Sequence, residues 1–134
     1  MYKGNKKDIK KWLAQRTKRG FSDYDVYEIN TWFLNIIPEM ISELIKRNNS
    51  FPAWLEFDYL KKHNLDWSDL TEKKKEEMVN FCFKKWTAIL LEMEKIFREA
   101  AKENKCEYSK NPAKRKALKF FVRYFDDLWF EEDK

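Results

Sequence analysis

The side chains that most often carry chemistry are few and scattered in this 134-residue sequence. The single histidine, His63, follows Lys61 and Lys62 near the expected end of a short helix, where we expect an exposed, dipole-compatible ring. A serine or cysteine nucleophile would have to use this histidine as its base. The cysteines Cys82 and Cys106 lie far apart, and we interpret them as a small buried apolar side chain and a loop thiol.

Metal and phosphate sites find little support in the residue types. A zinc site needs about four closely spaced cysteine or histidine ligands, and phosphate-cradling loops need several glycines, whereas only Gly4 and Gly20 occur. Asp23, Asp25 and Glu28 form an acidic cluster that is conceivable as a carboxylate metal site. Capping of a helix start and compensation of its dipole explain two of the three, and we favour this interpretation over a metal site. We therefore predict a protein that is not an enzyme and has no cofactor or metal.

Two basic segments, 3–19 and 110–119, are the remaining candidates for a functional surface. Lysine and arginine would contact phosphates, and an aromatic ring such as Trp12 would stack on a base. The alternative is a solvated charged surface with Trp12 as an anchor in the core. If the two segments converge, they form one positive face. The candidate residues are Lys7, Lys10, Lys11, Arg16, Lys18, Arg19, Lys114, Arg115, Lys116 and Lys119.

Composition predicts an all-α domain spanning residues 1–134. Aromatic residues make up 17% of the chain, which excludes disorder for most of it. Only two glycines and three prolines occur, and so few turn residues favour long helices joined by few loops. The net charge of +5 permits binding to nucleic acid or another anionic surface without requiring it.

The pattern of caps and apolar residues predicts a compact bundle of four to six helices. Ser22 and Asp25 match a capping box that begins a helix over 23–47, in which Pro38 should cause a kink or a break. Thr71 should cap a long central helix over 72–103. The ends of the chain are a basic helix or arm over 1–19, docked by Trp12, and an acidic tail over 131–134.

Aromatic residues dominate the expected core. The stripe on the central helix and the stripes on its neighbours predict a core containing Trp86, Phe97, Phe33, Phe121 and Phe125, and Trp67 should also pack inward. Six tryptophans exceed what a core of this size needs. We therefore expect one or two of them at an interface, where tryptophan is a favoured anchor.

The sequence also bears on location. No apolar run reaches the length of a membrane span, and no apolar stretch follows the basic N-terminus as in a secretory signal. Two distant cysteines suit a reducing compartment. These features favour a cytoplasmic protein that does not enter a membrane.

Three segments together resemble a group of small bacteriophage and prophage proteins of unassigned function. They are Arg19-Gly20-Phe21-Ser22-Asp23, a mid-chain helix led by Trp86, and Tyr124-Phe125 followed by Leu128-Trp129 near the C-terminus. This sequence departs from the pattern in having Tyr27 where a tryptophan is typical. The resemblance implies a phage setting and supplies no catalytic residues.

The resemblance and the missing catalytic chemistry lead to one main expectation about function. We expect a non-enzymatic phage accessory protein that binds a host protein or ribonucleoprotein complex in the cytoplasm of the infected bacterium. More specifically, we expect this protein to inhibit an antiviral defence system of the host, for example a CRISPR effector. The alternative is a protein that binds DNA or RNA through segments 3–19 and 110–119. Either way, we expect a monomer or a homodimer.

Overall fold

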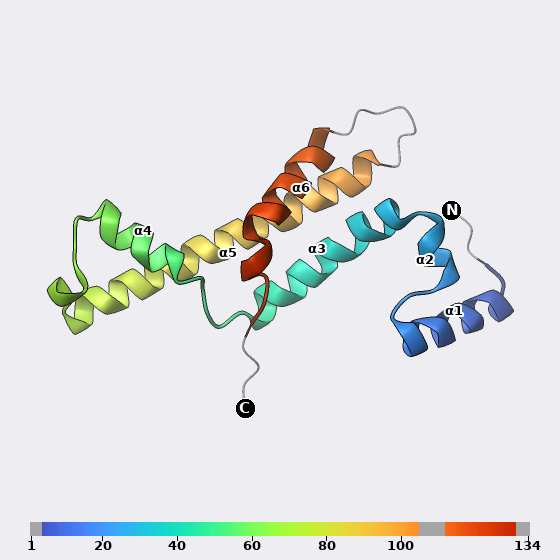
Figure 1. Cartoon of the computed structure of the whole chain (residues 1–134), viewed down its shortest axis with the longest axis horizontal. Coiled ribbons are helices and arrows are strands. Elements are labelled where there is room, and N and C mark those ends of the chain that lie inside the picture. Colours follow the sequence, from blue (N-terminus) through green and yellow to red (C-terminus); the bar gives the residue numbers. More distant parts are fainter. Residues whose placement is uncertain (1–3, 105–111, 131–134) are drawn as a thin grey trace.

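The structure, a computed structural model, describes residues 4–104 and 112–130, and within these ranges it is all-α (Figure 1). The predicted fold class is therefore confirmed. The predictions for Cys106, for the loop 105–111 and for the acidic tail concern residues outside the described ranges. The elements are α1 (Lys6–Arg19), α2 (Asp23–Tyr27), α3 (Ile29–Arg47), α4 (Trp54–Lys62), η1 (Trp67–Asp69), α5 (Glu72–Glu103), α6 (Pro112–Tyr124) and η2 (Phe125–Asp127).

Helix α5 is the long central helix that the sequence predicts. The hydroxyl of Thr71 accepts a hydrogen bond from the backbone N–H of Lys74, as expected of its N-cap. At 1.5 Å per residue the 32 residues of α5 extend for about 48 Å. Helix α4 packs along its N-terminal half, and α3 and α6 pack along its C-terminal half (Figure 1).

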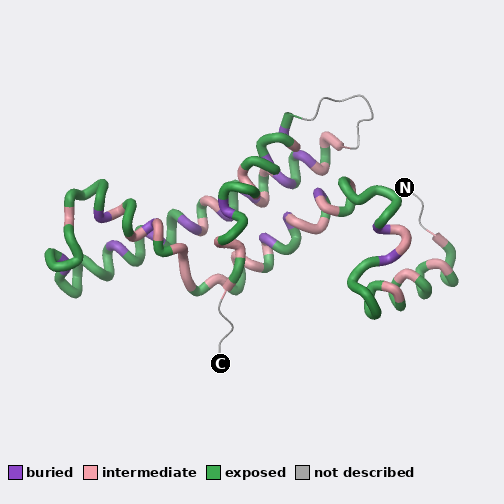
Figure 2. The backbone as a smooth tube through the Cα atoms, viewed as in Figure 1, coloured by how far each residue is buried: buried purple, intermediate pink, exposed green. Residues whose placement is uncertain are grey.

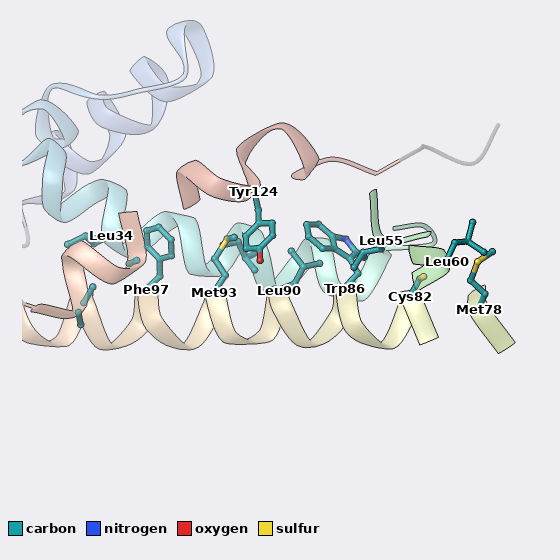
Figure 3. Packing of buried hydrophobic residues seen from close by; sticks show 14 of the residues in the cluster. Leu34, Leu55, Leu60, Met78, Cys82, Trp86, Leu90, Met93, Phe97 and Tyr124 are labelled. Atoms are coloured by element: carbon teal, nitrogen blue, oxygen red, sulfur yellow. The ribbon is translucent and has the colours of Figure 1, made fainter. Parts of the chain in front are cut away.

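One face of α5 supplies the centre of the core (Figure 3). Its buried residues recur every three or four positions, the spacing of a single helix face. They meet Leu34 and Ile41 of α3, Leu55 and Leu60 of α4, and Tyr124 of α6. Burial of each large apolar side chain contributes about 1.5–3 kcal/mol. The α5 residues of this face are Met78, Cys82, Trp86, Leu90, Met93, Phe97 and Ala100.

Most of the predicted aromatic core is confirmed. Trp86 and Phe97 are buried, and Phe33 and Phe121 pack edge-on against Phe97 and each other. Phe125 was predicted wrongly, because its side chain is 60% exposed. Helix α6 ends at Tyr124, and the tighter turn of η2 moves the next residue out of the helical period.

Trp67 was also predicted wrongly. Its side chain is 46% exposed. It lies on η1, where its ring meets the exposed ring of Phe57 edge-on at a centroid distance of 6.4 Å. A single 3-10 turn between α4 and α5 therefore displays this tryptophan at the surface.

The helix predicted over 23–47 is divided into α2 and α3. The capping box is confirmed, since Ser22 and Asp25 exchange side-chain and backbone hydrogen bonds. The helix ends after Tyr27, because Glu28 takes a non-helical backbone conformation with φ −143° and ψ 75°. The chain stays helical through Pro38, which is buried in α3, so the interruption lies at Glu28 and not at the proline.

Helices α1 and α2 form a hook, residues 6–27, that stands off the N-terminal end of α3 (Figure 1). Gly20 ends α1 with φ 83°, a left-handed conformation that glycine adopts without strain, and its N–H bonds to the Arg16 carbonyl at 2.9 Å. Helix α1 buries none of its residues (Figure 2). Trp12 is half-buried, and its ring packs against that of Tyr24 with a centroid distance of 4.7 Å and a tilt of 33°, so it anchors α1 to α2 and does not reach the main core.

Candidate functional site

Three of the candidate cations form ion pairs inside the hook. The guanidinium of Arg16 donates to both carboxylate oxygens of Asp25, from Nη2 to Oδ1 at 2.8 Å and from Nε to Oδ2 at 3.1 Å. Arg19 and Lys11 both approach Asp23, with N–O distances of 2.7 and 3.6 Å. Their charge is therefore largely balanced by α2, and their contacts hold α1 against it.

Asp25 is the centre of the hook. Its side chain is 7% exposed, and besides the Arg16 guanidinium it accepts the backbone N–H of Ser22 at 2.8 Å. The hydrogen bonds from Arg16, followed by those from Ser22, outweigh burial and lower the pKa of Asp25 to about 2. Hydrogen bonds from Gln15 and Arg19 lower the pKa of Asp23 as well. These carboxylates are thus occupied by caps and ion pairs.

The acidic cluster shows no metal-binding geometry in the part of the chain that the structure describes. No group of three or more histidine, cysteine, aspartate or glutamate side chains is arranged there to hold a metal ion. Asp23 and Asp25 point into contacts with α1, as described above. Capping and ion pairing therefore account for both, the alternative that the sequence left open.

The other candidate cations of α1 lie on its outward side. Among the described residues, Lys7, Lys10 and Lys18 take part in no ion pair, and all three are exposed. Leu13 lies three residues after Lys10, on the same side of the helix, and its side chain is exposed beside that lysine. This outer face of α1 is basic with a narrow apolar strip, a composition suited to an anionic partner.

Helix α6 carries the second group of cations. Its inner side is buried through Ala113, Ala117 and Tyr124, and Lys114 is half-buried beside them. The helix contains no acidic residue, and no ion pair involves its outer cations within residues 4–104 and 112–130. Leu118 and Val122 are exposed among these cations. We call the outer residues Arg115, Lys116, Lys119 and Arg123 the α6 cation face.

As far as the structure describes them, over residues 4–19 and 112–119, the two basic groups do not converge. Helix α1 packs on α2, whereas α6 packs on α5 and continues into η2. Figure 1 places α1 beyond one end of α3 and α6 alongside α5, well apart in the view. The single positive face expected if the segments met is therefore not formed. The α6 cation face and the outer face of α1 are separate surfaces.

A small hollow of about 240 Å³ lies between α3 and α5. Arg98 crosses it, donating to Glu39 at 2.9 Å and to Glu94 at 3.2 Å. The hydrogen bond to Glu39 is the main reason that the pKa of Arg98 is raised. Pro38 and Lys102 also line the hollow. An ion pair thus occupies its mouth, and the hollow is small beside typical ligand pockets of about 300–1,000 Å³.

The residues first considered for catalysis have structural surroundings. His63 is exposed at the end of α4, where its Nδ1 lies 2.8 Å from the Tyr59 carbonyl and its ring stacks on the Tyr59 ring at 4.1 Å. Cys82 is fully buried, and burial raises the pKa of its thiol. The predictions of an exposed histidine and a buried cysteine are confirmed.

An exposed apolar surface on α3 is the feature that sequence reasoning missed. The apolar positions of this helix were interpreted as one broad stripe, but only part of it faces α5. Ile29 and Met40 are 63% and 60% exposed, Trp32 is exposed, and Ile36 is half-buried between them. We call Ile29, Trp32, Ile36 and Met40 the outer α3 stripe. Its signal in the sequence was the width of the apolar pattern, which exceeds one helix face.

Comparisons of the chain with models of protein families, with curated proteins and with solved structures find no match. Among residues 4–104 and 112–130, no helix has the length and apolar character needed to cross a membrane. The surfaces described above therefore carry the functional argument.

Proposed function

We propose that this protein is a non-enzymatic phage accessory protein that binds a host protein or ribonucleoprotein through the α6 cation face. Inhibition of an antiviral defence system, such as a CRISPR effector, is the form of this function that we favour. The phage setting rests on the sequence resemblance. The observation that carries the binding surface is the row of outward cations on α6, which no carboxylate of that helix balances.

The geometry of the α6 cation face suits an extended anionic surface. Arg115, Lys119 and Arg123 follow one another at four-residue steps, which places them about 6 Å apart along the helix axis. Arginine donates in a planar fork that matches carboxylates and phosphates. Leu118 and Val122 add exposed apolar contacts between the charges. A protein partner with an acidic surface or a bound nucleic acid would satisfy both features.

Direct binding of DNA or RNA by the same face is the second candidate. It is favoured by the absence of acidic residues from α6, because a nearby carboxylate would repel phosphate. Of the originally predicted cations, Arg115, Lys116 and Lys119 belong to this face. Lys7, Lys10 and Lys18 remain candidates on the separate face of α1.

A pair of charge-reversal variants with equal change in net charge tests the proposal. Arg115→Glu/Lys119→Glu alters the α6 cation face, and Lys73→Glu/Lys84→Glu, at exposed positions of α5 outside both basic surfaces, is the matched control. We expect the first variant to lose both capture of a host partner and protection of phage growth in defended cells. The control should keep both. If the wild-type protein shows neither property, or if the two variants behave alike, the proposal is wrong.

Treatment of the captured complex with nuclease separates the two candidates. A protein partner should remain bound after RNA and DNA are digested, whereas a directly bound nucleic acid should be lost. For the second candidate, fluorescence anisotropy with labelled single-stranded and duplex probes should show affinity that falls steeply with salt. Absence of binding at low salt removes the nucleic-acid candidate.

A further inference from the structure

Helix α3 has two apolar faces, and only one of them is covered. Leu34, Pro38 and Ile41 are buried on the side that faces α5. Ile36 lies two residues from both Leu34 and Pro38, and at 3.6 residues per turn this places it on the opposite side. The outer α3 stripe therefore runs along the side of the helix that turns away from the bundle. The described elements leave this side largely uncovered.

The stripe extends over most of the helix. Its members are separated by three, four and four residues, the spacing that helix pairs use to interdigitate their side chains. On α2, just before the stripe begins, Val26 and Tyr27 are also exposed. A contiguous row of large apolar side chains on a protein surface is characteristic of an interaction site.

The total surface of the chain supports the same conclusion. Its accessible area is 10631 Å², whereas a monomeric globular protein of 16.5 kDa exposes about 7,600 Å². If the residues outside the described ranges are given the accessible area of an unfolded chain, the rest of the protein still exceeds the expected area by more than about 1,000 Å². A standard protein interface buries about 800 Å² per partner. The excess is thus large enough for a stable dimer.

We propose that a second copy of this chain covers the outer α3 stripe, forming a two-fold symmetric dimer with antiparallel α3 helices. The ends of α3 carry opposite net charges: Glu28 precedes the helix, and at its end the two cations Lys46 and Arg47 share one carboxylate, Glu43. An antiparallel arrangement brings the start of each helix to the end of the other, so these charges meet with the favourable sign. A two-fold axis near Ile36 makes the surface complementary to itself.

The acidic residues beside the stripe do not oppose this arrangement. Glu39 is paired with Arg98 at 2.9 Å, and Glu43 is paired with Arg47 at 2.9 Å. Their charge is therefore partly balanced within each copy before the copies meet. Neither the outer face of α1 nor the α6 cation face contributes to the stripe, so dimerisation leaves the proposed binding surface intact.

Sedimentation or light scattering over a range of concentrations tests the dimer. We expect the wild-type protein to dimerise with a Kd of about 1 μM or below. The variant Ile29→Glu/Met40→Glu should raise this Kd by at least about 100-fold, because it places charges in an apolar interface. Both side chains are exposed in the single chain, so the helical circular dichroism should not change. Val79→Glu/Leu91→Glu, at exposed positions of α5, is the matched control.

Three outcomes would overturn the proposal. They are a wild-type protein that stays monomeric at about 100 μM, a dimer that the Ile29→Glu/Met40→Glu variant leaves unaffected, and a dimer that the control variant weakens equally. If the Ile29→Glu/Met40→Glu variant loses the dimer but still captures the partner, dimerisation and partner binding are independent properties of the protein. Loss of partner capture alone would leave the dimer standing.

Disulfide cross-linking tests the position of the two-fold axis and the antiparallel direction of the two α3 helices. Every variant carries Cys106→Ser, and Cys82 is buried, so only the introduced cysteine is exposed to react. Ile36→Cys lies near the proposed axis, so two copies should form a disulfide-linked dimer readily, since bridged Cα atoms lie within about 7 Å. Ile29→Cys lies seven residues away on the same stripe, and antiparallel helices separate its two copies by roughly 21 Å along the axis, whereas parallel helices would bring them together. Cross-linking of Ile29→Cys as readily as Ile36→Cys would overturn the antiparallel arrangement.

Discussion

Seven side chains of α5 are buried against three neighbouring helices, whereas α1 buries none of its own. In the bundle of α3 to α6 the stabilising contacts are apolar and continuous. In the hook they are the ring contact of Trp12 with Tyr24, a capping box and the ion pair of Arg16 with Asp25. One chain thus uses two sources of stability, and we expect the two regions to respond differently to mutation, acid and salt.

The largest effect should come from the bundle. Trp86→Ala removes a buried ring that packs edge-on against Tyr124 at 5.9 Å, and it should lower the free energy of unfolding by about 3–5 kcal/mol. Denaturant unfolding followed by circular dichroism measures this. Trp129→Ala is the control, because this ring is exposed and should cost less than about 1 kcal/mol. Equal losses from both variants would contradict the proposed core.

Acid should release the hook before it unfolds the bundle. The pKa of Asp25 is lowered to about 2 in the folded chain, below the ordinary value of 3.8, so its pairing stabilises the hook above about pH 4. This contribution, about 2 kcal/mol, is lost as the pH falls through the folded value. Hydrogen exchange at the amides of α1 should therefore quicken between about pH 4 and pH 2 relative to those of α5.

The variant Asp25→Asn gives the control for this prediction. It removes the carboxylate and with it the titration, so protection of α1 should be weak at every pH from 2 to 7. If α1 in the wild-type protein keeps its protection down to about pH 2, or if α5 loses protection together with it, the hook is not an independently opening unit.

Helix caps allow a matched comparison of the two regions. Ser22 caps α2 in the hook, and Thr71 caps α5 in the bundle, each through its hydroxyl. Replacement of either by alanine should cost about 1 kcal/mol. Ser22→Ala should appear as faster hydrogen exchange in α1 and α2 only, whereas Thr71→Ala should shift the global unfolding midpoint. A global shift from Ser22→Ala would show that the hook and the bundle unfold together.

The same contrast explains which features the sequence predicted. The spacing of apolar residues predicted the buried face of α5 and the helices that pack on it. The residue types at Ser22 and Thr71 predicted the N-caps of two helices. The break at Glu28 could not be predicted, because neither glycine nor proline stands there. Phe125 was misplaced because η2 moves its side chain out of the helical period. Trp67 was misplaced because a loop or a single turn has no apolar period that shows which way its side chain faces.

The candidate site was predicted less completely than the fold. Its residue types were recognised, but charge composition does not reveal which cations are paired. Lys11, Arg16 and Arg19 are engaged with Asp23 and Asp25, and these contacts join residues of different helices. The outer α3 stripe belongs to an apolar pattern that is wider than one helix face, and such a pattern does not show which of its positions are buried. Only the arrangement of α3 against α5 distinguishes its two sides.

The smallest effect should come from the surface ion pairs of the bundle. Arg98 donates to Glu39 and Glu94, yet its side chain remains 45% exposed, so solvent screens both contacts. Arg98→Ala should lower the free energy of unfolding by less than about 1 kcal/mol, and added salt should reduce the difference further. Chemical denaturation with urea, which leaves ionic strength unchanged, is the suitable measurement. If Arg98→Ala lowered the free energy of unfolding by more than about 2 kcal/mol, the bundle would depend on its ion pairs as the hook does. A bundle that is stabilised by apolar burial alone should change little in stability when this arginine is removed.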